Sequence, residues 1–350
     1  MRQIKQQTEG EKKTMKKIAY KFTAAVLAAT LALTGCGSNK TTQNQATEET
    51  VTIRLGVVTN SITQFLSIVE KHAGIYQENG INLETTEFAM GINAVDSIVA
   101  GQVDITHIAE YAGVNRIGNT SDKTDLRFFT KFGQSDQFEL YVDPEKVSDI
   151  SDLEGQSVAT ITGSVYDYWY AKLFEYGGID KSQVDLQSVT SAQEALALAE
   201  SGSIVAYWAT SKKQKDLFAE KGWTSLITNG EVNADCIQVL VATEGFLSSN
   251  QATMVKFLKA TDETIQYIDE NFDEVAGWIN EDLGLDADTF KAALDYDFSF
   301  GFTEGTYEKI QQVNTWCRSN GNYTADFDIA DFLNLDAVKE YDAKLVTYSK

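Results

Sequence analysis

Residues 51–58 alternate apolar and polar side chains, and this period of two predicts a β-strand. A helix with apolar residues at helical spacing follows from Ser61, which can cap its start. The pattern continues with a strand over 81–88, a helix that opens at Gly91 and a strand over 103–108. The inward face of this second helix is expected to hold Val95, Ile98 and Val99. Such an order of elements predicts parallel βαβ units covered by helices.

A second α/β set begins near residue 150. Its predicted strands span 157–161, 184–189 and 204–208, and its predicted helices span 165–176 and 191–202. Ser191 and Glu194 match the S-x-x-E capping box at the start of the later helix. Beyond Ser249 the pattern becomes mainly helical. Two such sets in a chain of 350 residues indicate an α/β fold with two lobes.

The N-terminal segment carries an export pattern. Three basic residues, Lys16, Lys17 and Lys21, precede an apolar run over 22–33 that is too short to span a bilayer. The next residues, Leu33-Thr34-Gly35-Cys36, resemble the lipobox of bacterial lipoproteins. This resemblance implies an exported protein.

The lipobox resemblance also implies how the chain is processed. Residues 1–35 would be removed as a signal peptide, with Met15 as an alternative start, and Cys36 would be diacylated. Two acyl chains give stable anchoring to a membrane. Residues 36–50 are polar and are expected to form a flexible tether. The folded body would then lie at the outer face of the cell membrane or in a periplasm.

Charge narrows the range of partners. The formal net charge is −22, and without residues 1–35 the chain keeps 22 basic and 49 acidic residues, a net charge of −27. Such a surface repels nucleic acid and anionic lipid, so no nucleic-acid partner is expected.

The chain offers little for metal or covalent chemistry. Its two histidines, His72 and His107, are too few for a zinc site, and we expect neither a metal nor a cofactor. No G-x-S-x-G, P-loop or Ser/His/Asp arrangement is visible, so we do not expect an enzyme. Cys236 and Cys317 could form a disulfide in an exported protein or lie buried as small hydrophobes.

Four local patterns occur in a characteristic order. They are Gly74–Ile81, Gly91–Ile105, Ile150–Ala159 and a helical stretch from Phe246 to Asp286. In this order they resemble the substrate-binding proteins of ABC importers for nitrate, sulfonates, taurine and thiamine pyrimidines. The resemblance covers roughly residues 51–290.

The chain departs from that family in the second lobe. The segment 202–206 lacks the acids that the family often has there, and Trp208 is followed by Ala-Thr-Ser rather than by Glu-Pro. We therefore expect an altered pocket wall.

The resemblance implies a periplasmic-binding-protein fold of type II, with two α/β lobes and a ligand cleft between them. We expect lobe 1 to hold 51–140 and 240–350 and lobe 2 to hold 141–239, with crossings near Phe138–Val142 and Ile237–Val241. Closure would trap a small-molecule ligand and present it to the permease and ATPase of an ABC importer. We expect a monomer.

Ligands of open α/β sheets bind at the carboxyl ends of strands, which points to the strand-to-helix turns. The candidate ligand-binding residues are Thr59, Asn60, Ser61, Gln64, Gly91, Asn93, Glu110, Tyr111, Thr162, Gly163, Ser164, Tyr166 and Trp208. The turn Thr162-Gly163-Ser164 offers hydroxyls and backbone N–H groups to an anion, although Ser164 also suits a simple N-cap. Tyr166 and Trp208 could stack on a ligand or pack in the core.

Two ligand classes and two other functions stay open. An alkylsulfonate or taurine-like anion fits the turns, yet these turns hold no Arg or Lys. Glu110 near aromatic residues instead suits an amine or a pyrimidine-type ring. The chain could also be a relative that synthesises pyrimidines, or an adhesive surface lipoprotein without a small ligand.

Overall fold

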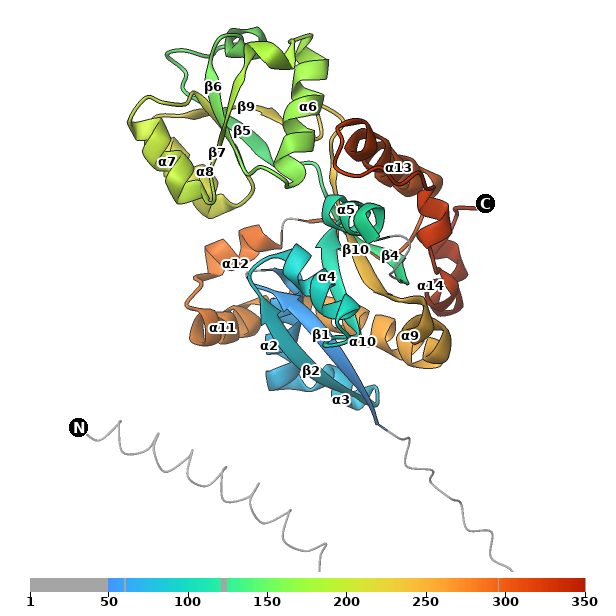
Figure 1. The fold of residues 1–350 in the computed structure, drawn as a ribbon. Coiled ribbons are helices and arrows are strands. Elements are labelled where there is room, and N and C mark those ends of the chain that lie inside the picture. Colours follow the sequence, from blue (N-terminus) through green and yellow to red (C-terminus); the bar gives the residue numbers. More distant parts are fainter. Residues whose placement is uncertain (1–49, 60, 121–124, 295, 350) are drawn as a thin grey trace, which may run out of the picture. The chain divides into compact units, whose positions relative to one another are not determined.

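The computed structural model describes residues 50–59, 61–120, 125–294 and 296–349 (Figure 1). Cys36 and Asn60, like the predicted signal peptide and nearly all of the predicted tether, lie outside these residues. Residues 48–350 form one compact unit. Among the described residues, no helix is both long and apolar enough to cross a membrane.

The first sheet, with the helices packed on it, is called lobe 1. Its strand order is β2-β1-β3-β10-β4, and its strands are β1 (Val51–Val58), β2 (Ile81–Phe88), β3 (Ile105–Ala109), β4 (Leu126–Ser135) and β10 (Cys236–Thr243). β1, β2 and β3 run parallel as predicted, whereas β10 is antiparallel to both of its neighbours. The alternation in β1 sets its inward face, where Ile53, Leu55 and Val57 are fully buried or nearly so.

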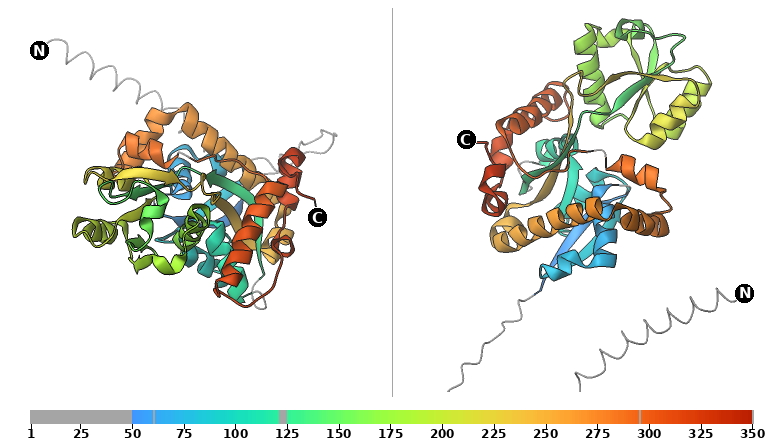
Figure 2. Two further views of the ribbon diagram at one scale, coloured as in Figure 1. Left: turned by 90° about the horizontal axis from the view of Figure 1, so that it is seen from above. Right: turned by 180° about the vertical axis from the view of Figure 1, so that it is seen from behind.

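The helices of lobe 1 cover both faces of this sheet. They are α2 (Ile62–Ala73), α3 (Ile75–Glu78), α4 (Gly91–Val99), α5 (Glu110–Thr120), α9 (Glu244–Ser249), α10 (Gln251–Glu270), α11 (Phe272–Leu283), α12 (Ala287–Ala293), α13 (Glu304–Ser319) and α14 (Asp336–Tyr341). The connections from β1 to β2 and from β2 to β3 run in opposite directions along the sheet, so right-handed crossovers put α2 and α4 on opposite faces. Figure 2 shows the long α10 lying across lobe 1 when it is seen from behind.

One inward position predicted for α4 is wrong. Val95 and Ile98 are buried, but Val99 is 38% exposed. Val99 is the last residue of α4, and the chain turns away at Gly101 with φ at +70°, so no neighbouring element covers this side chain.

The second sheet, with its own helices, is called lobe 2. Its strand order is β7-β6-β8-β5-β9, and its strands are β5 (Glu139–Val142), β6 (Ser157–Thr160), β7 (Asp185–Ser188), β8 (Ala206–Ala209) and β9 (Thr224–Thr228). β6 is parallel to β7 and β8, and β5 is antiparallel to β8 and β9. The helices are α6 (Val165–Gly177), α7 (Ala192–Glu200) and α8 (Lys212–Ala219).

The chain crosses between the sheets slightly before the expected positions. The expected crossings at 138–142 and 237–241 fall almost wholly on β5 and β10, each of which belongs to one sheet. The passages between sheets are 136–138, between β4 and β5, and 229–235, between β9 and β10. The apolar runs that suggested crossings are buried strands, whereas the passages themselves contain polar residues.

Candidate functional site

The carboxyl ends of the parallel strands in lobe 1 meet along one edge. β1 and β2 pair in register, and the backbone N–H of Thr59 donates to the carbonyl of Phe88 at 3.0 Å. β3 lies beside β1 in the same sheet. This register brings Thr59, Ser61, the turn at 89–93 and the start of α5 at residue 110 to one sheet edge.

At this edge, no described side chain caps α2 or α4, and neither helix has an acid in its first turn. Ser61 is the N-cap of α2, but its Oγ donates to the carbonyl of Val58 at 2.5 Å. Met90 is the N-cap of α4, and its side chain, 51% exposed, has no oxygen to offer. Backbone N–H groups in the first turn of a helix carry partial positive charge, so these two termini favour an anion.

The other predicted residues of this edge differ in exposure. Asn93 is exposed in the first turn of α4. Gly91 lies close to Ile108, because a Cβ atom at Gly91 would be 3.2 Å from that side chain. Gln64 is buried, and its Nε2 donates to Glu87 Oε1 at 3.3 Å. Asn93 is therefore open to a ligand, whereas Gln64 faces β2.

His107 adds no positive charge to this edge. It is buried in β3, and its Nδ1 lies 3.0 Å from Thr63 Oγ1. Burial lowers the pKa of His107 to about 4, so the ring is neutral at pH 7. Over the described part of the chain, no group of three or more His, Cys, Asp and Glu side chains could hold a metal ion.

The turn before α6 is occupied by its own helix. Ser164 caps α6 by accepting a hydrogen bond from the backbone N–H of Tyr166. The carboxylate of Asp167 accepts from the backbone N–H of Gly163 at 2.7 Å and from Thr160 Oγ1 at 3.2 Å. Thr162 is exposed beside this arrangement. An internal carboxylate thus fills the place that a bound anion would take in lobe 2.

Aromatic side chains gather where α6 meets the chain crossing. The Trp169 ring centroid is 5.1 Å from that of Tyr166, 5.1 Å from that of Phe138 and 5.8 Å from that of Trp208. Phe138 in turn contacts Tyr296 at 5.8 Å. Trp208 is fully buried and Tyr166 is 7% exposed, so Trp208 packs in the core of lobe 2 and Tyr166 lies nearer its surface.

Glu110 and Tyr111 face the crossing and the C-terminal helices. Glu110 is 1% exposed, and its Oε2 accepts from the backbone N–H of Ile237 at 2.8 Å, while its Oε1 has no partner among the described residues. Burial raises the pKa of Glu110 to about 8, although the hydrogen bond from Ile237 opposes this shift. The Tyr111 hydroxyl accepts from Asn322 Nδ2 at 3.0 Å.

Both described cysteines are free thiols. Cys236 lies at the start of β10 and Cys317 lies in α13, and both are buried. The disulfide alternative is therefore wrong, and the two residues are small buried hydrophobes. Burial raises the pKa of Cys317 to about 12, which keeps the thiol protonated.

Sequence comparison identifies the class of this two-lobed α/β protein. A sequence model of the NMT1-like family matches residues 46–280. The chain therefore belongs to the NMT1-like family, and the predicted family is confirmed. No curated protein matches the sequence.

Solved structures confirm the periplasmic-binding-protein fold. The aliphatic sulphonate binding protein SsuA of Escherichia coli superposes with a TM-score of 0.71 at 15% identity, covering 81% of this chain and 92% of that chain. A putative sulfonate-binding SsuA of Methylobacillus flagellatus gives 0.70 at 16% identity, covering 86% and 98%. The desulfurization enzyme DszB gives 0.64 at 11% identity, covering 84% and 99%.

Two residues at the centre of the site escape the sequence analysis. Asp167 follows Ser164 by three positions, and this S-x-x-D spacing is the signal that could have revealed the occupied turn. Asn229 precedes Gly230, an Asn-Gly pair typical of a turn, and lies fully buried at the start of the passage 229–235. Its hydrogen bonds join segments 91 residues apart, which no local pattern encodes.

Proposed function

We propose that this chain is an exported solute-binding protein that captures a small organic anion of the alkylsulfonate type and delivers it to an ABC importer. Membership in the NMT1-like family and the likeness to SsuA support the binding role. Lobe closure about the passages at 136–138 and 229–235 would trap the ligand. The permease would recognise the closed form, and the binding protein would act as a monomer without catalysis.

The observation that supports an anionic ligand is the pair of uncapped helix N-termini at the lobe 1 edge. α2 and α4 start after the carboxyl ends of the neighbouring strands β1 and β2, with no first-turn acid among the described residues. A sulfonate placed there accepts hydrogen bonds from backbone N–H groups and needs no Arg or Lys. The exposed Met90 offers apolar contact to an alkyl chain.

Glu110 supports a second ligand class. A buried carboxyl with one free oxygen, close to Tyr168 and Tyr296, suits the donor groups of an aminopyrimidine or an amine. Such a ligand would sit deeper, against the crossing, and leave the lobe 1 edge empty.

The anchoring and the domain limits are part of the same proposal. Cys36 would carry the lipid, residues 36–50 would form the tether, and the cleft would lie between a lobe of 51–140 plus 240–350 and a lobe of 141–239. Metabolic labelling with a fatty acid tests the anchor, because a Cys36→Ser variant should lose the label.

A thermal-shift panel on residues 48–350 tests the ligand class, since the whole described core lies in this compact unit. A ligand at one hundred times its Kd adds about 2.7 kcal/mol to the free energy of unfolding. Alkylsulfonates should raise the Tm by several degrees, and aminopyrimidines should not. A shift with aminopyrimidines alone would favour the deeper site at Glu110.

A further inference from the structure

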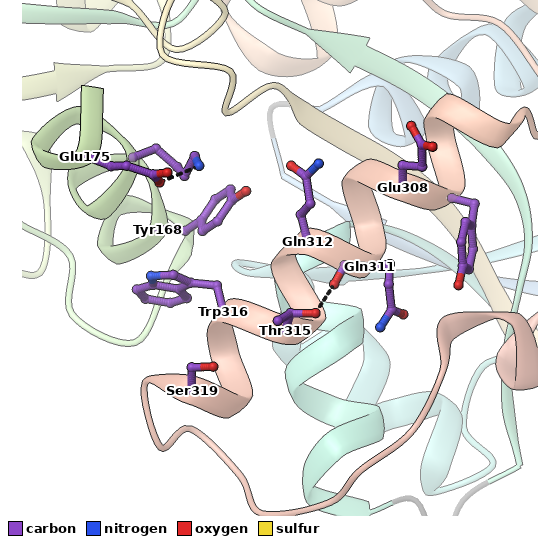
Figure 3. A pocket seen from close by; sticks show the side chains of 10 residues that line it. Tyr168, Glu175, Glu308, Gln311, Gln312, Thr315, Trp316 and Ser319 are labelled. Carbon is purple, nitrogen blue, oxygen red and sulfur yellow. Dashed lines mark hydrogen bonds and ion pairs between the residues drawn. The ribbon is translucent and has the colours of Figure 1, made fainter. Parts of the chain in front are cut away.

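A groove lies between α6 of lobe 2 and α13, which packs on lobe 1 (Figure 3). Its volume is about 730 Å³, in the range of small-molecule sites. α6 contributes three lining residues and α13 contributes seven: Tyr168, Lys172 and Glu175, then Tyr307, Glu308, Gln311, Gln312, Thr315, Trp316 and Ser319.

The groove combines aromatic surface with negative charge. The rings of Tyr168 and Trp316 meet edge to face at 5.5 Å, one from each lobe. The single cation, Lys172, already pairs with Glu175 at 2.6 Å. Glu308 is exposed and forms no ion pair in the described part of the chain. Tyr168 is 3% exposed, so a cation bound here gains from the partly exposed Trp316 ring and from an uncompensated carboxylate, whereas an anion would be repelled.

The inner end of the groove leads toward a buried carboxyl. Tyr168 and Gln312 line both the groove and a smaller cavity of about 10 Å³, roughly the room for one water. Glu110 also lines this small cavity, and its Oε1 is buried and has no partner among the described residues. Lys309 there is neutralised by its ion pair with Asp235.

We propose that the groove between α6 and α13 is a second ligand site, separate from the anion site, for a small organic cation that carries an ammonium group on an aromatic or alkyl body. The body of the ligand lies on Trp316, and the ammonium group lies near Glu308.

Occupancy of this groove is coupled to lobe movement. Because α6 belongs to lobe 2 and α13 packs on lobe 1, any change in the angle between lobes changes the groove. A bound cation and a cleft ligand therefore alter each other's affinity by the same factor. This coupling rests on the proposed function, whereas the cation site itself does not.

Benzylammonium, titrated into residues 48–350 at low ionic strength, is the probe. We expect saturable binding of benzylammonium. Benzyl alcohol, its neutral counterpart, should bind at least tenfold more weakly. Trp316→Leu should weaken benzylammonium binding at least tenfold, and Glu308→Gln should weaken it about threefold to tenfold. Glu304→Gln, in the first turn of α13 and outside the groove, is the matched control and should change nothing.

Binding that Trp316→Leu and Glu308→Gln leave unchanged, or an absence of binding by the unaltered chain, would overturn the groove site. Asn93→Asp separates the two proposals, because it alters only the anion edge of lobe 1. If Asn93→Asp strengthens benzylammonium binding while the groove variants do not affect it, the amine binds at the lobe 1 edge, and the groove inference fails independently of the importer function.

Discussion

The side-chain Oδ1 of Asn229 accepts a hydrogen bond from the backbone N–H of Phe138 at 2.9 Å, and this bond joins the two passages between the lobes. The Asn229 amide also donates to the carbonyls of Ser135 and Ala234, both at 3.0 Å. The residue is fully buried. One amide therefore satisfies three backbone groups at the place where the chain must bend if the lobes move.

Replacing Asn229 should be costly. In Asn229→Ala, three buried backbone groups lose their partners, so we expect a loss of about 3 kcal/mol in the free energy of unfolding. Urea unfolding measures this loss. Asn119→Ala, at an exposed asparagine of α5, is the control and should stay within about 0.5 kcal/mol of the unaltered chain. Equal losses in both variants would contradict a bridging role for Asn229.

Proton binding by Glu110 should make the free energy of unfolding depend on pH. Its folded pKa of about 8 lies above the ordinary value of 4.5, so the folded state holds an extra proton between these values. Stability therefore falls as pH rises toward 8, by at most about 1.4 kcal/mol per pH unit. His107, with a folded pKa of about 4, has the opposite effect below pH 6.5, where its unfolded form takes up a proton.

The effects of Glu110 and His107 on stability oppose each other below pH 6.5. Between pH 6.5 and 8, only the effect of Glu110 is expected. We expect that Glu110→Gln removes the decline in this range when unfolding is measured at several pH values. Glu154→Gln, at an exposed position in lobe 2, should retain the decline. A decline that persists unchanged in Glu110→Gln would show that another group causes it.

The parallel strands of both lobes and the helices between them could be predicted from the sequence, but the strands β4 and β9 and the helices α5 and α8 were not predicted. β1 and β2 have the predicted bounds, because alternation of apolar and polar residues reports burial on one face of a sheet. The antiparallel strands β5 and β10 were less visible, since their pairing depends on partners far along the chain. Asn229 could not be predicted for the same reason, because it hydrogen-bonds to residues of both passages, which are far apart in the sequence.

The candidate site was harder to predict than the fold. The sequence located the turns, but for Ser164, Tyr166 and Trp208 it left open whether the residue binds a ligand or has a structural role. Side-chain contacts decide otherwise, because Asp167 occupies the turn of Gly163 while no described side chain caps α4 at Gly91. Trp208 also ends a strand, yet its ring lies wholly inside lobe 2.

Removing the negative charge at the lobe 2 turn should strengthen anion binding. Asp167→Asn keeps an oxygen that can accept from Gly163 but lacks the charge, so we expect alkylsulfonate affinity to rise about threefold to tenfold. Asp180→Asn, which alters the cap before β7 at the opposite sheet edge, should leave affinity unchanged. An unaltered Kd in Asp167→Asn would show that the lobe 2 turn does not face the anion bound at the lobe 1 edge.

The packing of α5 against the C-terminal segment leaves no room at Gly118. A Cβ atom there would lie 2.4 Å from the Tyr323 ring, so Gly118→Ala should destabilise the chain by about 2 kcal/mol or more. Gly277 in α11 has nothing within 4 Å, and Gly277→Ala should stabilise it by up to about 1 kcal/mol. Thermal unfolding of both variants measures this difference in stability. Equal stability of Gly118→Ala and Gly277→Ala would contradict the prediction.

An acid at the start of α4 should separate stability from binding. Asn93→Asp places a carboxylate in an uncapped first turn, so the helix should gain about 0.3–1 kcal/mol. The same carboxylate would compete with a bound anion for the backbone N–H groups. Circular dichroism during urea unfolding measures this gain in stability. Gln102→Glu, beyond the end of α4, is the control and should show no gain.

Calorimetric titration of an alkylsulfonate into the unaltered chain and into Asn93→Asp tests the anion site most directly. We expect one site per chain with a Kd near the micromolar range, about −8 kcal/mol, weakened at least tenfold in Asn93→Asp although that variant is no less stable. Equal sulfonate affinity in both proteins, or binding of an aminopyrimidine in place of the sulfonate, would contradict an anion site at the helix termini of lobe 1.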